Sequence, residues 1–548
     1  MPTDCISYQN SGYFSPLMND YLEQKSNLQP LYNRFPYLEN FEAQIEEKKI
    51  NFPSPALPEG EGAAINNNTI SCNKRKVLVS VLEKQYSKIV TSDKTLNNIK
   101  LLNDSNTFTI TTGHQLNLFT GPLYFLYKII STINLTKELK AKYPSQNFVP
   151  IYWMATEDHD FEEINYFNFK GRKFRWNAAS SGPVGRLSTE GLADFFEVYS
   201  NELDTGTNAN AIKKMFQDAY LNHSNLAEAT QHLANALFGK YGLVILDADN
   251  QDLKREFIPF MKEELISQTS YKNVIETAKK LKNYTIQVNP REINLFYLED
   301  NLRERILFEN GKYTVNNAKI EFSESEILEL LEIHPEKFSP NVIMRPLYQE
   351  VILPNLCYIG GGGEIAYWLE LKSFFEAMKI TFPILLLRNS ALLATEKQAT
   401  KADKLGLSWS DLFTKQKNLV NSKTAQLSKF SIDFSIQKEH LQKQFEALYE
   451  IAHQTDKSFL GAVKAQEAKQ IKGLENLEKR LLKAQKRKHS EELERIMDLQ
   501  NELFPNQSLQ ERQANFSEFY LENGNDLIEN LMLQLKPLDD NFNIIILP

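Results

Sequence analysis

Cysteine is scarce in this chain, which has three, Cys5, Cys72 and Cys357, far apart and without a Cys-x-x-Cys pair. An odd number of separated cysteines supports neither a disulfide framework nor a structural zinc site, and we predict no metal. Long apolar runs are also missing, because no window approaches the roughly 20 apolar residues that a membrane-spanning helix needs. The first residues, MPTDCISYQN, lack the basic start and apolar core of an export signal. We therefore expect a cytoplasmic protein with no membrane partner.

An excess of positive charge is likewise absent, since the formal net charge is -8. This balance argues against a general nucleic-acid surface, and we expect no nucleic-acid partner. The sequence also lacks a Walker A loop, a dinucleotide-binding glycine fingerprint and a serine nucleophile elbow. A chain of 548 residues is too long for one hydrophobic core and indicates about two to four domains.

Strands and helices alternate through the first 390 residues. Thr107–Thr112 is rich in β-branched residues, a helical repeat follows, and NFVPIYWMAT forms a second strand, so the three segments predict a parallel βαβ unit. Further buried strands are predicted in three segments, 241–249, 356–379 and 382–390. The pattern predicts one doubly wound parallel sheet of the α/β class.

Two segments interrupt this sheet, and a helical region follows it. Each interruption begins with short alternating segments typical of antiparallel strands, NYFNFKGRKFRWN in the first and YTIQVNPREINLFYLED with RERILFENGKYTV in the second. The expected division is a core of residues 1–164, 236–264 and 341–392, inserted segments 165–235 and 265–340, a helical arm 393–520, and a tail 521–548 that returns to the core.

Proline is missing from 391–504, where Lys, Glu, Gln and Leu dominate. One helical face is marked by Phe445, Leu448 and Ala452, and another by Leu474 and Leu477. This spacing predicts two long helices in an antiparallel hairpin. We expect the arm to form a homodimer, and the alternative is a helix laid across its own core.

Ligands of open parallel sheets bind beyond the carboxyl ends of the strands. The first such end carries a loop with an imidazole and two amides near a positive helix terminus, suited to a phosphate or to developing negative charge. Its members are Thr112, Gly113, His114, Gln115 and Asn117. The alternative is a histidine that only caps its own loop.

The second strand end carries several acids. Asp158, His159 and Asp160 stand beside Glu157, Glu162 and Glu163. Clustered carboxylates repel one another unless a cation is near, so they predict either an ammonium site or a metal site with His159 as nitrogen ligand. A solvated helix start is the alternative, mainly for the last two glutamates.

The other two strand ends are a glycine loop and an arginine. Gly360 to Gly363 allow backbone N–H groups to approach an anion, and Glu364 would cap the following helix or bind a polar substrate; a structural tight turn is the alternative. Arg388, with Asn389, could bind a carboxylate or phosphate, or form a surface ion pair, and Arg345 is a weaker candidate.

Four stretches together resemble the bacillithiol-biosynthesis family of cysteine ligases (BshC): TTGHQLNLFTGPLYFLYKIISTI, PIYWMATEDHDFEEIN, GGGGEIAYWLELK and FPILLLRNSA. They occur in the family's order, and the resemblance extends over nearly the whole chain. It implies a Rossmann-like core with two inserted connecting segments and a C-terminal α-helical coiled-coil domain used in dimerisation. One departure is Gly362, where the family commonly has proline.

The activity that the resemblance implies is the last step of bacillithiol synthesis, in which the carboxyl group of L-cysteine is joined to the glucosamine nitrogen of glucosaminyl-malate. Amide formation from a free carboxylate needs activation, so ATP is expected as a co-substrate. The family's motifs place the site at Thr112, Gly113, His114, Gln115, Asp158, His159, Asp160, Gly361, Gly363 and Glu364.

Roles follow within this hypothesis. His114 and the glycine-loop N–H groups would stabilise phosphate or an oxyanion, Asp158 or Asp160 would hold the amine or take its proton, and Arg388 would bind a malyl carboxylate. Class I synthetase folds carry paired histidines and a mobile lysine loop, whereas this chain has His114 alone. The alternatives are a nucleotidylyl transferase acting on another small acid and a non-catalytic scaffold that uses the arm.

Overall fold

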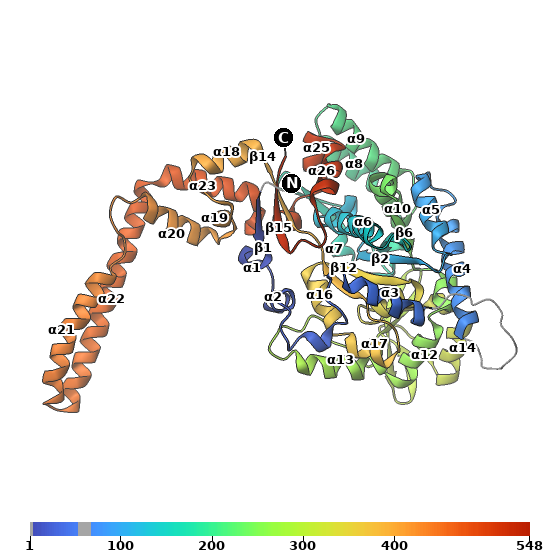
Figure 1. Ribbon diagram of the computed structural model, residues 1–548, viewed down its shortest axis with the longest axis horizontal. Coiled ribbons are helices and arrows are strands. Elements are labelled where there is room, and N and C mark those ends of the chain that lie inside the picture. Colours follow the sequence, from blue (N-terminus) through green and yellow to red (C-terminus); the bar gives the residue numbers. More distant parts are fainter. Residues whose placement is uncertain (1–3, 53–66, 548) are drawn as a thin grey trace. The chain divides into compact units, whose positions relative to one another are not determined.

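The computed structural model describes residues 4–52 and 67–547, and the chain divides into two compact units (Figure 1). The core unit comprises the residues up to Gln9, Tyr13–Leu392 and Gln510–Ile545. The arm unit comprises Asn10–Gly12, Leu393–Leu509 and the residues after Ile545. The last segment of the core unit therefore comes from beyond the arm in sequence.

Five parallel strands form the central sheet of the core unit, in the order β13-β12-β2-β3-β6. Their bounds are Ile384–Leu387 for β13, Asn355–Gly360 for β12, Thr107–His114 for β2, Asn147–Met154 for β3 and Val244–Asp247 for β6. The sequence runs outward from β2 to β6 and then resumes on the other side with β12. This confirms the doubly wound sheet, and its order reverses between β2 and β12, where such folds bind ligands.

Helices α6 (Tyr124–Lys142) and α3 (Asn40–Asn51) help to bury this sheet. α6 packs on β2 and β3, and α3 packs on β12. The strands contribute alternate apolar residues because successive side chains point to opposite faces. One cluster joins them, containing Phe41, Ile45, Phe108, Ile110, Leu135, Leu139, Phe148, Leu356, Cys357, Ile359, Ile384 and Leu386. Cys357 is thus a core residue.

The first inserted segment opens with a hairpin of β4 (Tyr166–Phe169) and β5 (Arg172–Arg175) and continues mainly as helices α8 (Leu192–Ser200), α9 (Thr207–Phe216) and α10 (Leu226–Phe238). Aromatic rings hold it to the loop after β2. The Phe119 ring centroid lies 5.7 Å from that of Phe167 and 5.4 Å from that of Phe216. The insertion therefore supports one of the predicted site loops.

The second inserted segment contains an antiparallel sheet in the order β10-β9-β8-β7-β11. Its strands are β7 (Leu295–Glu299), β8 (Leu302–Glu309), β9 (Lys312–Val315), β10 (Glu321–Phe322) and β11 (Phe338–Pro340). Asn310 and Gly311 both have positive φ between β8 and β9, as an Asn-Gly hairpin turn requires. The strand expected in YTIQVNPREINLFYLED begins only at Leu295, because the preceding stretch contains Pro290 and runs as loop.

The C-terminal part of the core unit also contacts the loop that follows β2. Asn515 precedes α25 (Phe516–Asn523), and its side-chain amide donates hydrogen bonds of 2.8 Å to the Phe119 carbonyl and 2.6 Å to the Gly121 carbonyl. Phe119 and Thr120 have positive φ, which is uncommon for residues with a side chain. Asn515 therefore helps to hold the loop in a conformation that the chain adopts with difficulty.

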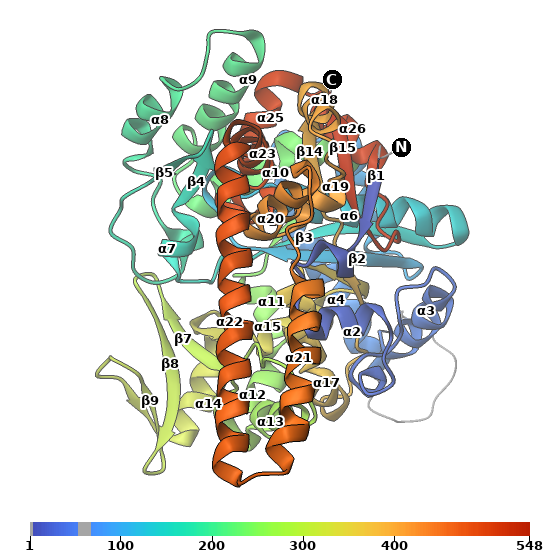
Figure 2. The ribbon, with the colours of Figure 1, turned by 90° about the vertical axis from the view of Figure 1, so that its left-hand side faces the viewer.

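The arm unit is helical. Its longest elements, α21 (Ser435–His453) and α22 (Lys457–Lys488), lie side by side in Figure 2, joined through Asp456, which caps α22. Phe445, Ala452 and Val463 form the buried cluster between them. The antiparallel hairpin is therefore confirmed. The remaining arm helices are α18 (Glu396–Lys404), α19 (Trp409–Phe413), α20 (Gln416–Leu427) and α23 (Ser490–Leu503).

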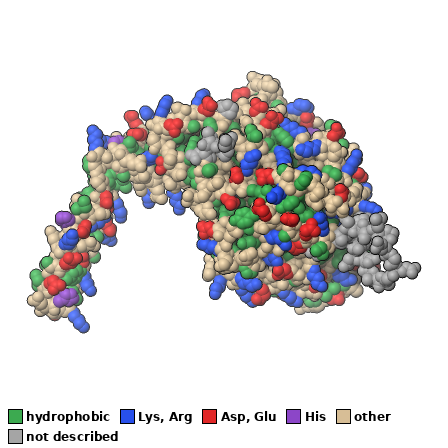
Figure 3. All heavy atoms as spheres, viewed as in Figure 1, with side chains coloured by type: hydrophobic (Ala, Val, Ile, Leu, Met, Phe, Trp, Pro, Cys, Tyr) green, Lys and Arg blue, Asp and Glu red, His purple; other side chains and the backbone are tan. Residues whose placement is uncertain are grey.

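Acidic and basic side chains are interspersed on the face shown in Figure 3, without a large area of one sign. Among the described residues, no helix is both long and apolar enough to cross a membrane. In the same part of the chain, no three His, Cys, Asp or Glu residues form a group that could hold a metal ion.

Candidate active site

The glycine loop ends β12 and begins α16 (Gly362–Leu369). Gly361 has φ -74° and ψ 168°, an extended conformation that starts the helix. Glu364 accepts a 2.8 Å hydrogen bond from the Gly361 N–H and a 2.7 Å hydrogen bond from the Tyr358 hydroxyl. The predicted capping role of Glu364 is therefore present, and both of its oxygens have partners.

Lys128 of α6 connects this loop to the end of β2. Its Nζ lies 2.5 Å from Glu364 Oε2 and donates a 2.8 Å hydrogen bond to the Gly113 carbonyl. Burial alone would raise the pKa of Glu364, but Lys128 and the hydrogen bonds outweigh it, and the pKa is lowered. Burial also lowers the pKa of Lys128, so the contacts, and not the pKa shifts, show that this pair links the end of β2 to the start of α16.

His114 closes β2 with a buried imidazole. Its ring centroid lies 5.0 Å from that of Phe125 and 5.5 Å from that of Tyr124, and Nε2 is buried with no hydrogen-bond partner among the described residues. Burial, with smaller effects of Lys128 and Arg388, moves the pKa of His114 well below its usual value. The imidazole is therefore neutral, and an unpaired nitrogen of this kind can serve an incoming ligand.

Arg388 lies at the end of β13 and is buried. Its Nη2 donates a 2.8 Å hydrogen bond to Glu511 Oε1, and its Nη1 donates to the Asn389 carbonyl and to Ser390 Oγ. The Arg388 guanidinium lies 5.1 Å from the centroid of the Tyr124 ring. Its charge is thus already balanced by a buried carboxylate, so the alternative of a surface ion pair is wrong.

Asn389 and Thr112 have internal partners as well. Asn389 Oδ1 accepts a 2.8 Å hydrogen bond from Ser131 Oγ, and its Nδ2 donates to the Lys536 carbonyl at 2.6 Å. The Thr112 hydroxyl donates a 2.8 Å hydrogen bond to the Ile359 carbonyl across the β2–β12 pair. Both side chains therefore act on the framework of the site.

Arg345 of α15 (Met344–Ile352) lies beside Gly113. A Cβ atom on Gly113 would lie 3.5 Å from Arg345 Nη1 and 3.2 Å from the Tyr358 hydroxyl. Arg345 donates hydrogen bonds to Gln349 Oε1 at 3.1 Å and to the Tyr367 hydroxyl at 3.4 Å. The absence of a side chain at Gly113 thus lets this guanidinium approach the end of β2.

A second group of polar residues follows β2 and β3. Gln115 Nε2 lies 2.9 Å from Asp158 Oδ2 and 2.9 Å from Glu163 Oε2, so one amide bridges two carboxylates. Arg303 Nη1 lies 3.9 Å from Asp158 Oδ1 and donates a 2.6 Å hydrogen bond to His159 Nδ1, because arginine can only donate. Burial would raise the pKa of Asp158, but its hydrogen bonds and Arg303 lower it overall.

Asn117 and Asp160 complete the predicted residues. Asn117 Nδ2 donates a 3.2 Å hydrogen bond to the Glu163 carbonyl, and its Oδ1 is buried without a partner among the described residues. Asp160 is exposed and makes no side-chain capping bond to the short helix α7 (Phe161–Ile164). The structure therefore brings Gln115, Asn117 and Asp158 around Glu163 and leaves Asp160 in solvent.

Buried acids adjoin this second group at the ends of β3 and β6. Lys254 Nζ lies 2.6 Å from Glu157 Oε1 and 3.0 Å from Asp249 Oδ1, and Asp247 accepts a 2.5 Å hydrogen bond from the Thr156 hydroxyl. Burial and the neighbouring charge of Asp249 raise the pKa of Asp247 to about 7. Lys254 thus balances part of the acidic charge that the sequence pattern left unexplained.

Lys128, Tyr358 and Arg303 did not emerge as site residues from the sequence. Lys128 had a usable signal, because it is the one charged residue in the apolar stretch from Leu123 to Leu135. A lone lysine in such a stretch must find a buried partner. Tyr358 and Arg303 had no such signal, since their roles depend on contacts between segments far apart in sequence.

Comparisons with known proteins match the whole architecture. The family model "Bacillithiol biosynthesis BshC, N-terminal Rossmann-like domain" matches residues 1–389, and "Bacillithiol biosynthesis BshC, C-terminal coiled-coil domain" matches residues 391–547. Three relatives bear the name "Putative cysteine ligase BshC". The Flavobacterium johnsoniae protein is 70% identical, and the match covers 100% of both chains. The Flavobacterium psychrophilum and Christiangramia forsetii proteins are 64% and 58% identical, with 100% of this chain and 99% of each relative covered.

Proposed function

Since the chain belongs to the BshC family of bacillithiol biosynthesis, we propose that it joins the carboxyl group of L-cysteine to the amino group of glucosaminyl-malate. The observation that carries this proposal is the match of both family domains over nearly the entire chain. The arrangement of Lys128, Glu364 and His114 at the reversal between β2 and β12 supports it, because this crevice is where the fold binds ligands.

Activation of the cysteine carboxylate is the first chemical requirement. We propose ATP as the co-substrate, with AMP and pyrophosphate as the other products when the new carbon–nitrogen bond replaces the carbon–oxygen bond to adenylate. The neutral His114, whose Nε2 is buried without a partner among the described residues, and the N–H groups that begin α16 would stabilise negative charge on phosphate or on the acyl oxygen.

The amine must also be held and must lose its proton before attack. Asp158 carries a lowered pKa, so it is a good counter-charge for an ammonium group and a weak proton acceptor. Gln115 and Arg303 fix its position. We therefore propose that Asp158 binds the substrate amine and that the proton leaves to solvent.

The decisive experiment is a reaction with pure protein. L-cysteine, glucosaminyl-malate and ATP should yield the amide, detected by mass spectrometry, together with one pyrophosphate per amide. His114→Ala should remove turnover while the protein remains folded, as circular dichroism would show, and His334→Ala, the same change at an exposed histidine, should retain turnover. Amide formation without ATP would disprove the adenylate route. No amide under any condition, with pyrophosphate released by another acid, would favour the nucleotidylyl transferase.

A deletion strain supplies an independent test of the pathway step. Thiol profiling should show loss of bacillithiol and accumulation of glucosaminyl-malate. Unchanged bacillithiol would contradict the proposal. Stable recovery of other pathway enzymes with the pure but inactive protein would favour a scaffold.

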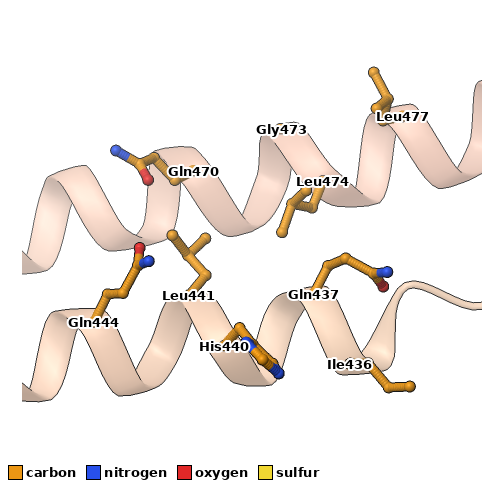
Figure 4. A pocket seen from close by; sticks show the side chains of 9 residues that line it. All are labelled: Ile436, Gln437, His440, Leu441, Gln444, Gln470, Gly473, Leu474 and Leu477. Atoms are coloured by element: carbon orange, nitrogen blue, oxygen red, sulfur yellow. The ribbon is translucent and has the colours of Figure 1, made fainter.

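We also propose that the chain forms a homodimer through the hairpin of α21 and α22. An open groove of about 740 Å³ runs along this hairpin, and Leu441 and Leu474 point toward the facing helix within it (Figure 4). None of its nine lining residues is Asp, Glu, Lys or Arg. Ile436 and Leu477 are 67% and 53% exposed, although they are apolar. Exposed apolar residues along a groove are typical of a surface that another chain covers.

A further inference from the structure

We infer that Arg345 binds a carboxylate of the malyl group of the acceptor substrate. The inference rests on the proposed function for the identity of that substrate. Its basis is that the basic side chains near the ends of β2 and β12 differ in whether an internal carboxylate already pairs with them. A carboxylate needs a cation that is reachable, fixed in position and free of an internal counter-charge.

Arg345 alone among the basic residues of this site meets the last condition. Lys128 is paired with Glu364 at 2.5 Å, and Arg388 is paired with Glu511 at 2.8 Å. Within the described residues, Arg345 forms no salt bridge with Asp or Glu; the charge of Glu364 helps to raise its pKa, but that carboxylate is itself paired with Lys128. A partly buried guanidinium without a counter-charge is costly, and an anionic ligand would remove that cost.

Arg345 also retains donors for a ligand. A guanidinium has five N–H donors, and two neutral acceptors, Gln349 Oε1 and the Tyr367 hydroxyl, take one each. Arg388, in contrast, donates to three oxygen atoms, one of which is a carboxylate oxygen of Glu511. The inference therefore assigns the malyl carboxylate to Arg345, whereas the family hypothesis assigned it to Arg388.

A chain of buried polar groups, which begins at Gln349, orients the guanidinium of Arg345. Gln349 presents its amide oxygen to Arg345 because its Nε2 donates a 3.0 Å hydrogen bond to Glu350 Oε1. Glu350 is held in turn by Asn355 Nδ2 at 2.6 Å and by Lys48 Nζ at 3.2 Å. Because every member is buried and has partners, Gln349 cannot turn without breaking a hydrogen bond. The guanidinium is therefore positioned before the ligand arrives.

Two residues beside Arg345, Gly113 and Tyr358, connect it to His114 and to the glycine loop. Gly113 directly precedes His114 in the sequence and lies beside Arg345, and its carbonyl accepts a hydrogen bond from Lys128. Tyr358 lies next to Arg345 and donates to Glu364 of the glycine loop. A ligand carboxylate on Arg345 would thus place the rest of the substrate at the mouth of the β2–β12 crevice.

The test compares Arg345→Gln and Arg345→Lys with the wild-type protein on two acceptors. Glucosaminyl-malate carries the carboxylates, and methyl glucosaminide lacks them. Arg345→Gln should lower kcat/KM for glucosaminyl-malate by roughly 100-fold, mainly through KM, and leave kcat/KM for methyl glucosaminide unchanged. Arg345→Lys should recover only part of the loss because lysine keeps the charge without the planar fork. Arg305→Gln, at an exposed arginine of β8, is the matched control.

Binding measurements separate this inference from the proposed function. Titration calorimetry with glucosaminyl-malate should show weaker binding to Arg345→Gln, while ATP binding and the melting temperature stay unchanged. Equal binding of glucosaminyl-malate by wild type and variant would overturn the inference, even if the amide is formed. A selective loss of ATP binding would also overturn it and assign Arg345 to phosphate. Arginine-dependent binding of glucosaminyl-malate without any turnover would uphold the carboxylate site and refute the ligase.

Discussion

The basic side chains around the β2–β12 crevice have the same sign of charge but differ in the groups that they contact. Lys128, Arg345 and Arg388 are all cations, yet Lys128 and Arg388 are paired with the carboxylates of Glu364 and Glu511, whereas Arg345 donates hydrogen bonds to neutral groups. Their pKa shifts follow from burial and from these partners. The same partners are the reason that we propose a ligand site at Arg345 and framework roles for the other two.

Lys128→Met should separate a structural role from a functional one. The change removes the ammonium group and leaves the Glu364 carboxylate without its counter-charge and the Gly113 carbonyl without its side-chain donor, so the free energy of unfolding of the core unit should fall by about 3 kcal/mol. Urea unfolding measures the change. The double variant Lys128→Met/Glu364→Gln should lose less than the sum of the two single variants, because the unpaired charge is gone. Strict additivity would show that the pair is not coupled.

Glu370 supplies a pH-dependent prediction. Its Oε1 accepts a 2.8 Å hydrogen bond from the Gln287 N–H, its Oε2 is buried without a partner among the described residues, and burial raises its pKa to about 7. Because the folded pKa lies above the unfolded value, this carboxyl stabilises the fold most below about pH 4.5, and that contribution is lost as pH rises to 7.

Glu370→Gln should therefore be more stable than wild type at pH 8, by on the order of 2 kcal/mol, and similar to it at pH 4.5. Thermal unfolding at a series of pH values measures the difference. A constant difference between wild type and variant across this range would contradict the assignment.

At the scale of elements, the first turn of α16 has the backbone conformation that a proline at position 362 would need. Gly361 has the extended conformation that a residue before proline prefers, and Gly362 occupies the first helical position, where proline is favoured. A Cβ on Gly362 would lie 3.2 Å from Met18 Cγ, an atom of a flexible side chain. The turn is thus compatible with the proline that the family commonly carries here.

Gly362→Pro should raise the free energy of unfolding by about 0.5–1 kcal/mol, because proline restricts the unfolded chain and fits this helical position. Differential scanning calorimetry measures the shift. Gly182→Ala is the contrasting variant, since Gly182 has φ +68° and its Cβ would lie 2.6 Å from the Asp300 carbonyl oxygen. That change should destabilise. A loss of stability in Gly362→Pro as well would mean that Met18 cannot move aside.

At the scale of the whole molecule, the hairpin groove is the surface that we expect to find covered. Leu477→Glu should shift sedimentation from dimer to monomer at micromolar concentration, because a charge would enter an uncharged groove. Leu533→Glu, at a 68% exposed leucine of α26 (Asp526–Gln534) in the core unit, is the matched control and should leave the dimer intact. A wild-type protein that sediments as a monomer would contradict the proposed dimer.

The sequence alone determined the doubly wound α/β sheet and the helical hairpin, although not the order of the strands. These features depend on local patterns, β-branched runs, glycine and proline at turns, and apolar residues at helical spacing, that neighbouring residues already carry. The same patterns located His114, Asp158 and the glycine loop at strand ends. They could not tell a ligand residue from a framework residue.

Tertiary structure decided which charges are already balanced. Arg388 and Glu511 are 123 residues apart, Lys128 and Glu364 are 236 apart, and Arg303 reaches Asp158 from the second insertion. The pKa of a side chain and its freedom to bind a ligand depend on burial and on charges within a few ångströms. Such distances are set by the folded chain and not by position in the sequence, which is why we assign the substrate carboxylate to Arg345 and not to Arg388.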